Sequence, residues 1–379
     1  MIISLRKVLV LGSLLLVAWI GWRSYNYFFD KTIPALVVKG IEQDACYGGD
    51  VRCLVNVSKS GDAYVWLDNK LIISKFRISK PKFETMLPIP TQTISNGRHS
   101  LKIEVIDGTY HKNSSTFECS FVVDNLPLQA ALIRVGSENK VFQGRTLHVQ
   151  IQTNKELKSA RVNALAGVFE CFPEAESSTI YECFIPVACE EAANEYPLKV
   201  EVVDKANNTV YLDDKFQVMS FPFKKHVVTV SEEKMKIERE CGLPTIQLDG
   251  HLEACTKASP SKKLWKGAFF IPLEMTKVTC DYGTMRTTNE KGKYSHRALD
   301  IIGPMKCMVW APHDGVVVVK ARYVHTGNTV VVDHGFGILS ILCHLDSFAD
   351  ISVGDRVRRG SPVGIMGKTG YASGPHLHW

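Results

Sequence analysis

The stretch LKIEVID at residues 101–107 recurs with two conservative changes as LKVEVVD at residues 198–204. In both copies apolar side chains alternate with polar ones, the period of a β-strand with one buried and one solvated face. Each copy leads through turns containing Asn into another short apolar run. The copies lie 97 residues apart, close to the length of one immunoglobulin-like sandwich. The repeat therefore predicts two tandem all-β sandwiches, at residues 34–125 and 126–221.

Length and composition indicate a globular protein of several domains. The chain has 379 residues, of which 45% are hydrophobic and 22% charged. Disordered, collagen-like and polytopic membrane proteins have other compositions, and this length suits two or three domains. The formal net charge is +6, and no run of five or more basic residues occurs. We therefore expect no nucleic-acid partner.

The amino terminus has the order of an export signal. Arg6 and Lys7 precede an uncharged apolar run of 15 residues, from Val8 to Trp22. As a helix this run would be about 22 Å long, shorter than the ~30 Å hydrocarbon core, but flanking aromatic and basic side chains can extend it. No small-residue cleavage site follows the run. We expect residues 1–30 to form a transmembrane signal anchor; a cleaved signal and a buried helix of a soluble domain are the alternatives.

Eleven cysteines favour an exported protein in an oxidising compartment. Three pairs that flank short turns or loops are the candidate disulfides: Cys46–Cys53, Cys171–Cys183 and Cys241–Cys255. The other pairings cannot be deduced from the sequence. No C-x2-C knuckle occurs, so a metal site built from cysteines is not expected. Cys280, Cys307 and Cys343 lie near the carboxyl terminus without an assigned role.

A charged stretch follows the second repeat. Ser231 precedes the run from Glu232 to Glu240, which has the pattern of a capped surface helix. We interpret residues 222–263 as a linker that contains this short helix.

The last hundred residues are rich in histidine. His296 and Asp300 form an H-x3-D pattern in a segment with strand character, so their side chains are expected on one face of a strand. His376 and His378 form an H-x-H pattern and would share a face for the same reason. His344 follows another strand-like run. Neutral imidazole and carboxylate suit Zn²⁺, and three such ligands leave one coordination position open.

Residues 264–379 resemble the lysostaphin-type zinc endopeptidases of bacterial cell-wall metabolism. Besides H-x3-D, the resemblance rests on these motifs in the same order: W-x-G-x-F-x-x-P from Trp265, Y-G-x-x-R from Tyr282, V-x-A-P-x-D-G-V from Val309, G-N-x-V-x-V-x-H-G from Gly327, H-L at His344, G-D-x-V-x-x-G from Gly354, and G-x-T-G-x-x-S-G-P-H-L-H from Gly367. Family members usually have Gly at the position of Ala298. They normally continue beyond the position of Trp379 through a closing strand, so we expect a truncated domain.

The resemblance implies a β-rich peptidase domain built on an antiparallel sheet. It implies one Zn²⁺ per chain, with His296, Asp300 and His378 as its ligands. It also implies that His344 and His376 are catalytic, acting on the attacking water and stabilising the tetrahedral intermediate. We expect the remaining histidines of the region to be structural (His334) or exposed in loops (His313 and His325).

The function that the resemblance implies is that of a zinc metalloendopeptidase that hydrolyses peptide cross-links or stem peptides of peptidoglycan. The alternative is an inactive relative that activates a cell-wall amidase by binding it, although such relatives typically lack one or more of the five residues that are present here. An adhesion or scaffold protein is a third hypothesis. The expected location is the bacterial cell envelope, inner-membrane anchored with periplasmic domains, or secreted if the signal is cleaved. Cell-wall or division proteins are further candidate partners.

Overall fold

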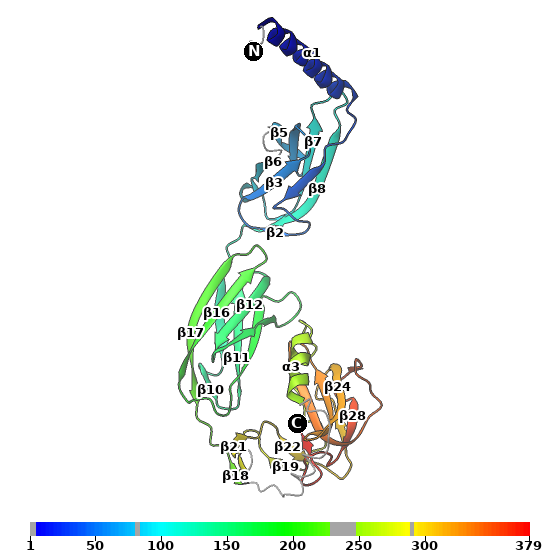
Figure 1. Cartoon of the computed structure of the whole chain (residues 1–379). Helices are drawn as coiled ribbons and strands as arrows, with labels where there is room; N and C mark the ends of the chain where they lie inside the picture. The colour runs from blue at the N-terminus through cyan, green and yellow to red at the C-terminus, as the bar shows by residue number, and fades with distance from the viewer. Residues whose placement is uncertain (1–4, 80–83, 228–247, 289–291) are drawn as a thin grey trace. The chain divides into compact units, whose positions relative to one another are not determined.

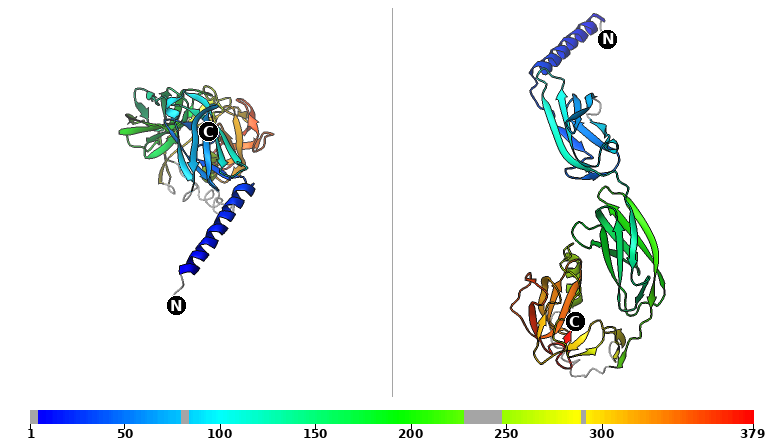
Figure 2. Two further views of the ribbon diagram at one scale, coloured as in Figure 1. Left: turned by 90° about the horizontal axis from the view of Figure 1, so that it is seen from above. Right: turned by 180° about the vertical axis from the view of Figure 1, so that it is seen from behind.

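The computed structural model describes residues 5–79, 84–227, 248–288 and 292–379. These residues form mostly β-structure, with two α-helices among them (Figure 1). The chain divides into two compact units, one of Met1–Leu128 with Val203–Thr209 and one of Gln129–Val202 with Val210–Trp379. Figure 2 shows the β-rich bodies from two further sides. The domain boundaries expected from the sequence remain predictions.

The first β-body is a sandwich of two sheets. The smaller sheet has the order β1 (Leu36–Lys39), β3 (Val51–Val57), β6 (Glu84–Ile89). The larger sheet has the order β2 (Cys46–Tyr47), β8 (Ser114–Val123), β7 (Gly97–Asp107), β4 (Gly61–Leu67), β5 (Lys70–Ile78), and the 3-10 helix η1 spans Thr91–Thr93. Both sheets contribute to one core, in which Val55, Val65 and Ile103 have no exposed surface. The alternating burial along these strands makes this two-layer packing possible.

The second β-body also has two sheets. One has the order β10 (Lys140–Phe142), β17 (Thr209–Met219), β16 (Glu195–Asp204), β12 (Leu157–Ala164), β13 (Gly167–Glu170). The other has the order β14 (Phe172–Pro173), β15 (Ile180–Pro186), β11 (Thr146–Thr153), β9 (Ala130–Val135). Fully buried side chains come from both, such as Ile151 on β11 and Leu198 on β16.

The sequence repeat occupies equivalent strands of the two bodies. Every second side chain of β7 from Leu101, and of β16 from Leu198, is buried, and both strands end on a buried aspartate. Asp107 accepts hydrogen bonds from Thr109 and Asn113, and Asp204 accepts them from Asn208. The prediction of half-buried strands is confirmed. Each aspartate also satisfies the polar groups of the turn that follows its strand. That these sandwiches belong to the immunoglobulin-like class remains a prediction.

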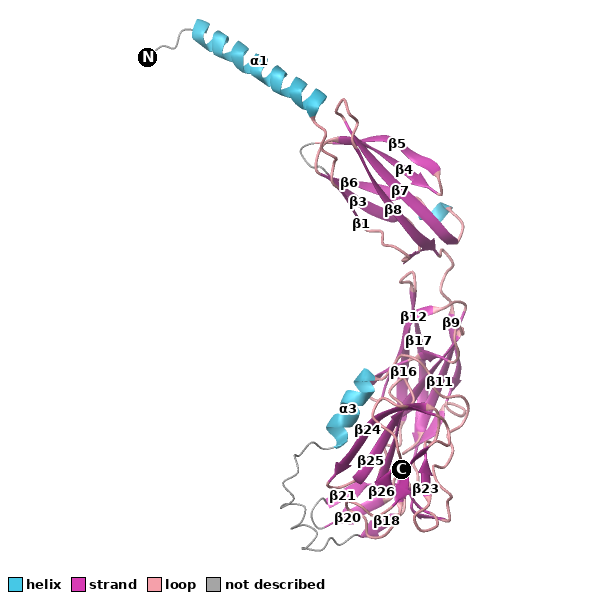
Figure 3. Ribbon diagram, turned by 90° about the vertical axis from the view of Figure 1, so that its right-hand side faces the viewer, coloured by secondary structure: helices cyan, strands magenta, loops and turns pink. Residues whose placement is uncertain are grey.

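The carboxyl-terminal region is built on a long antiparallel sheet (Figure 3). Its order is β19 (Lys277–Cys280), β22 (Asp300–Ile302), β29 (Leu377–His378), β26 (Leu339–Phe348), β25 (Gly327–Asp333), β24 (Gly315–Tyr323), β27 (Arg356–Val357), with β23 (Met308–Trp310) and β28 (Pro362–Met366) joined through β26. A smaller sheet has the order β18 (Lys225–Val227), β20 (Met285–Thr288), β21 (Gly292–Ser295), and the helix α3 spans Leu248–Ala258. Ile301, Val330 and Leu377 lie fully buried in the core of the long sheet.

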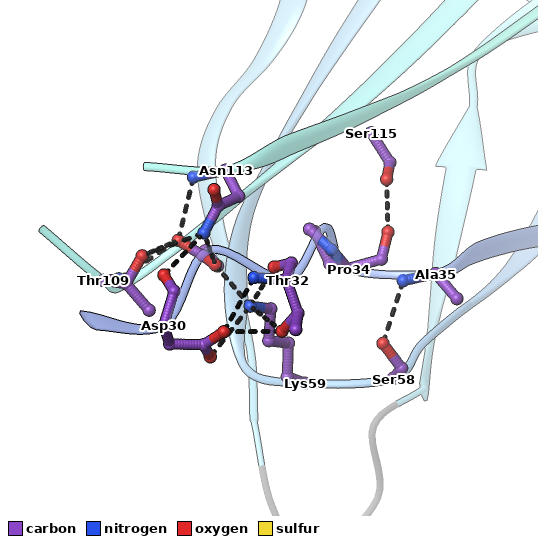
Figure 4. A network of polar contacts seen from close by, with 10 residues as sticks. Asp30, Thr32, Pro34, Ala35, Ser58, Lys59, Thr109, Asn113 and Ser115 are labelled. Atoms are coloured by element: carbon purple, nitrogen blue, oxygen red, sulfur yellow. Dashed lines mark hydrogen bonds and ion pairs between the residues drawn. The ribbon is translucent and has the colours of Figure 1, made fainter. Parts of the chain in front are cut away.

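The amino-terminal helix α1 spans Leu5–Phe29. The chain that follows it is fastened to the first sandwich by a polar network around Lys59 (Figure 4). The Lys59 Nζ atom lies 3.1 Å from Asp30 Oδ2 and 2.7 Å from Asp107 Oδ2, and it also donates to the Thr32 carbonyl. Asn113 donates to Asp107 Oδ2 and to the Asp30 carbonyl. Lys59 thus neutralises two carboxylates at one end of the sandwich.

Within the described part of the chain, no helix combines the length and apolarity needed to cross a membrane. The transmembrane anchor expected at residues 1–30 is therefore not confirmed. The helix expected at Glu232–Glu240 and Cys241 lie outside the described residues.

The structure shows no disulfide among the cysteines that it describes, so the disulfide predictions are not supported there. Cys53 is a free buried thiol on β3, whereas Cys46 lies on β2 in the other sheet of the sandwich. Cys171 and Cys183 were correctly expected to lie close together, but both are thiols, and a hydrogen bond to Cys183, with burial second, raises the pKa of Cys171 strongly. Cys255 is a free thiol on α3. The spacing around a turn correctly predicted that Cys171 and Cys183 lie close together. It could not predict that Cys46 and Cys53 lie in different sheets, because the sheet that a strand joins depends on distant parts of the chain.

Candidate metal centre

Three neighbouring strands bring the predicted ligands together. Asp300 begins β22 and pairs directly with His378 on β29, and Cys343 on β26 pairs with His378 from the other side. Leu299 and Trp379 exchange backbone hydrogen bonds of 2.8 and 3.0 Å next to the Asp300–His378 pair. His378 is therefore held between two strands.

His296 reaches the same place by a different route from the one the sequence suggested. It follows β21, and residues 297–299 between it and β22 are not in a strand. Four residues of extended chain would cover about 13 Å, yet His296 Nε2 lies 3.2 Å from Asp300 Oδ1. The prediction that one strand carries both side chains is wrong: the bend between the strands, rather than a shared strand face, makes them meet.

The three predicted ligand atoms form a nearly equilateral triangle. His378 Nδ1 lies 2.9 Å from Asp300 Oδ1 and 3.2 Å from His296 Nε2, and the third edge is the 3.2 Å between His296 and Asp300. A tetrahedral ion with bonds of about 2.0–2.1 Å separates its ligand atoms by roughly 3.3 Å. Two imidazole nitrogens and a carboxylate oxygen are also ligands that Zn²⁺ accepts. The residues present thus fit a zinc ion.

The Asp300 carboxylate is held in its charged form. Burial raises its pKa, but hydrogen bonds and charges from His296 and His378 oppose burial and bring the pKa well below the ordinary range of an aspartate. Its outer oxygen, Oδ2, accepts a hydrogen bond of 3.1 Å from Arg286 Nη2. The carboxylate is therefore negative, as a metal ligand has to be.

Two further histidines stand beside the triangle. His344 Nδ1 lies 2.8 Å from the Thr369 carbonyl oxygen, and His376 Nδ1 lies 2.8 Å from that of Gly374. A carbonyl only accepts, so Nδ1 carries the proton in both rings, and the Nε2 lone pair of a neutral ring is left for other partners. His376 Nε2 lies 3.8 Å from Asp300 Oδ1. The ring centroids of His344 and His376 are 4.8 Å apart. The structure thus brings all five predicted site residues together.

His344 is buried and its backbone is strained. Burial, with smaller contributions from neighbouring histidines, lowers the pKa of His344 to about 4, so the ring is neutral at pH 7. Its φ of 61° lies in the left-handed region, which side chains other than glycine rarely adopt. The pairing register of β25 with β26 shifts next to this residue. Such strain is common at functional sites, where the surrounding structure fixes a side chain in one direction.

The other histidines of the region lie apart from the triangle. His334 is fully buried, with Nδ1 2.7 Å from the Asp314 carbonyl and Nε2 2.9 Å from Ser340 Oγ. His325 is exposed, as expected for a loop residue. His313 is buried, contrary to expectation, and its Nε2 lies 2.8 Å from the Lys266 carbonyl oxygen.

The comparison with known families agrees with this geometry. Residues 294–379 match the model of peptidase family M23. The carboxyl-terminal region is a peptidase M23 domain. The M23 domain contains every predicted ligand and both further histidines.

Curated relatives of the M23 domain are named as peptidases. The DD-carboxypeptidase/endopeptidase Mpg of Neisseria meningitidis is 33% identical over 115 residues, which cover 30% of this chain and 26% of that protein. The peptidoglycan DD-endopeptidase ShyC of Vibrio cholerae is 31% identical over 109 residues, covering 28% and 25%. The chain thus spans about a quarter of the length of these relatives. A crystal structure described as a peptidase M23 from Pseudomonas aeruginosa is 24% identical, with a TM-score of 0.41, covering 63% of this chain and 87% of that one.

Proposed function

We propose that the protein is a zinc metalloendopeptidase that hydrolyses peptide bonds of peptidoglycan, in its cross-links or stem peptides. The observation that carries this proposal is the triangle of His296, Asp300 and His378 atoms, with edges of 2.9–3.2 Å, beside two histidines that each have an Nε2 lone pair. The name of the relative ShyC, a peptidoglycan DD-endopeptidase, supports peptidoglycan as the substrate.

His296 Nε2, Asp300 Oδ1 and His378 Nδ1 would hold the zinc ion. When bound, zinc supplies Lewis acidity that activates water and polarises the scissile carbonyl. His376 and His344 accept no proton at Nδ1, because that atom donates to a carbonyl, so proton transfer falls to Nε2 of these rings. Each imidazole makes one of these hydrogen bonds to a carbonyl, and that bond fixes the orientation of its ring.

Burial determines the protonation state of His344. The low pKa of His344 makes its ring neutral, and an imidazole of this kind accepts a hydrogen bond from water without taking the proton fully. We assign His376, whose Nε2 atom lies 3.8 Å from Asp300 Oδ1, as the general base and later the general acid. We assign His344 to orienting the water and the developing oxyanion.

The decisive experiment is digestion of purified peptidoglycan sacculi by the full-length chain loaded with zinc, with mass analysis of the soluble products. Hydrolysis adds one water per bond and leaves a new amine and a new carboxylate, so the product masses identify the bond. The matched control is His378→Ala, which removes a ligand. The amidase-activating alternative would be supported by a different result. The wild-type chain alone would leave the sacculi intact, and an amidase would dissolve them faster with the chain than without it.

We also propose that the protein acts outside the cytoplasm, in the bacterial cell envelope, where this substrate lies. The basic pair Arg6-Lys7 ahead of an apolar run supports export. Fractionation of cells that produce the full-length chain tests the location. Recovery in the periplasmic or membrane fraction is expected, and recovery in the cytosol alone would contradict the proposal.

A further inference from the structure

The hairpin that leads into His296 is joined to the second sandwich. Its strands are β20 and β21, and β18 pairs with β20 as a third strand. β18 is the strand that follows β17 of the sandwich in the chain. The hairpin also carries Arg286, whose Nη2 donates to Asp300 Oδ2 at 3.1 Å and to Cys280 Sγ at 3.2 Å. The part of the chain that leaves the sandwich therefore supports the hairpin from which the candidate metal centre is built.

The orientation of His296 depends on its backbone. Its Nδ1 atom is buried without a hydrogen-bond partner among the described residues, whereas a ligand histidine usually donates this second nitrogen to a carboxylate or a carbonyl. The His296 N–H donates to the Thr284 carbonyl at 2.9 Å, and its carbonyl accepts from the Gly283 N–H at 2.7 Å. The ring is therefore positioned by the turn at residues 282–284 and by the residue that precedes it in the chain.

The second sandwich contacts both of these supports. Glu190, in the connection between β15 and β16, is hydrogen-bonded through Oε1 to the hydroxyl of Ser295, a residue that is only 6% exposed. A carboxylate only accepts, so the hydroxyl is the donor. Gly283 has a φ of 82°, and a Cβ atom there would collide with the ring of Phe223 and lie 3.1 Å from Cys189 Sγ. Residues of the sandwich and of the chain just after it thus contact the turn and the neighbour of the ligand.

The sandwich also contacts the carboxyl-terminal region at a second place. Phe172 on β14 stacks on Phe336 with ring centroids 4.2 Å apart, and its centroid lies 5.8 Å from that of Trp265. Lys263 Nζ lies 2.7 Å from Glu182 Oε2 on β15, and the Glu182 side chain is only 7% exposed. Aromatic pairs and charged hydrogen bonds have specific geometries. Two separate sets of contacts therefore hold the sandwich against this region.

We propose that Glu190 of the second sandwich is a positioning residue for the ligand His296 and acts through Ser295. The inference rests on the proposed function, because it requires a metal ion held by His296. The charged hydrogen bond restrains Ser295, and Ser295 restrains the backbone from which the His296 ring projects. The pair of Glu190 with Arg297 contributes little, since it spans 4.0 Å and both side chains are exposed. The sandwich is then a part of the catalytic unit.

The zinc affinity of the full-length chain, in competition with a chelator, measures this positioning. Residues that bond to a ligand side chain typically change metal affinity by about 10- to 100-fold, and Glu190 acts through one further residue, so we expect Glu190→Ala to bind zinc about three- to tenfold more weakly. Glu191→Ala is the matched control. Glu191 is the next residue of the same connection, but it accepts a hydrogen bond of 2.7 Å from Tyr196 Oη within the sandwich, so its loss should leave the affinity unchanged.

The possible results separate the inference from the proposed function. Equal zinc affinities of the Glu190→Ala and wild-type chains would overturn the role of Glu190 and leave the proposed function standing. A wild-type chain that binds no zinc would overturn both. An equal loss of affinity in Glu191→Ala would also overturn the inference, because the effect would then belong to the whole connection.

A double-mutant cycle tests the route through Ser295. Ser295→Ala should weaken zinc binding as much as Glu190→Ala does, and the double variant should be no weaker than either single variant, because one substitution already removes the contact. Losses that multiply in the double variant would overturn this route.

The visible spectrum of the chain loaded with Co²⁺ distinguishes positioning from a merely structural contact. A residue that only stabilises the packing of the sandwich would change the unfolding temperature and leave the cobalt spectrum as it is. A displaced His296 changes the geometry around the metal, so the Glu190→Ala spectrum should differ from that of the wild-type chain. Identical spectra of the two folded chains would contradict the inference.

Discussion

Arg286 holds the outer oxygen of the Asp300 carboxylate. Its Nη2 donates to Oδ2 at 3.1 Å, so Oδ1 is turned toward His296 and His378. Arg286 lies on β20 and pairs with Tyr294 on β21, the strand that leads into His296. One hairpin thus supplies both the residue that orients the carboxylate and the neighbouring ligand. Outer residues of this kind determine how well a metal site is preorganised.

Arg286→Lys is expected to weaken zinc binding by about 10- to 100-fold, because an ammonium cannot reproduce the planar donor that bridges Asp300 and Cys280. Competition with a chelator measures the affinity. Arg297→Lys is the control, since Arg297 is next to His296 in sequence but its side chain is mostly exposed and lies 4.0 Å from Glu190. Equal affinities of the Arg286→Lys and wild-type chains would show that the contact does not orient the ligand.

His376→Ala and His378→Ala are expected to fail in different ways. His378 provides one corner of the ligand triangle, so its loss should release the metal. His376 lies 3.8 Å from Asp300 through Nε2, outside that triangle. Its loss should leave the zinc content unchanged and lower hydrolysis by about 10²- to 10⁴-fold. Metal analysis and sacculus digestion on the same preparations separate the two effects. Wild-type turnover by His376→Ala would refute the role of His376.

The sequence predicted which residues lie close together at the candidate metal centre, but not the backbone path that brings them there. The resemblance to the lysostaphin-type endopeptidases selected His296, Asp300 and His378, because each lies at a position that matches a motif of that family. The predicted shared strand face was wrong, because the bend at residues 297–299 has no strong local signal. The alternation at residues 101–107 and 198–204 predicted buried strands correctly, since that burial depends on a period of two within one strand.

Contacts between distant strands could not be predicted in the same way. Cys280 faces Asp300 only because β19 pairs with β22, and the sequence does not reveal that register. Cys46 and Cys53 were paired on spacing alone, although they belong to different sheets. His313 is expected to be exposed in a loop, but it is buried and hydrogen-bonds to the Lys266 carbonyl. Arg286 was visible in the Y-G-x-x-R motif, yet its partners depend on the folded hairpin.

The low pKa of His344 should make the metal-free protein less stable in weak acid. Burial lowers the folded-state pKa to about 4, below the value of about 6.5 in an unfolded chain. Between these values the unfolded state binds a proton that the folded state does not. The contribution of His344 to the free energy of unfolding is therefore complete above about pH 6.5. It falls toward pH 4 by up to about 1.4 kcal/mol per pH unit.

Comparison with His344→Gln isolates this contribution. The difference in unfolding free energy between the two chains, measured by urea titration, should shrink as the pH falls from about 6.5 to 4. Other buried histidines, such as His334, are present in both chains and cancel in the difference. A difference that does not change with pH over this interval would contradict a neutral, buried His344.

Lys59 is expected to be important for the stability of the first sandwich. It donates to Asp107, whose side chain is only 1% exposed, and to Asp30 near the end of α1. Lys59→Met would leave a buried carboxylate without its cation, which costs about 2 kcal/mol when a charged hydrogen bond is lost. Arg98→Met is the control, because both Arg98 and its partner Asp44 are more than half exposed, and such pairs contribute less than about 1 kcal/mol. Calorimetry of the full-length chain should show a lower transition temperature for Lys59→Met alone. Equal shifts for both variants would mean that the buried network contributes no more than a surface ion pair.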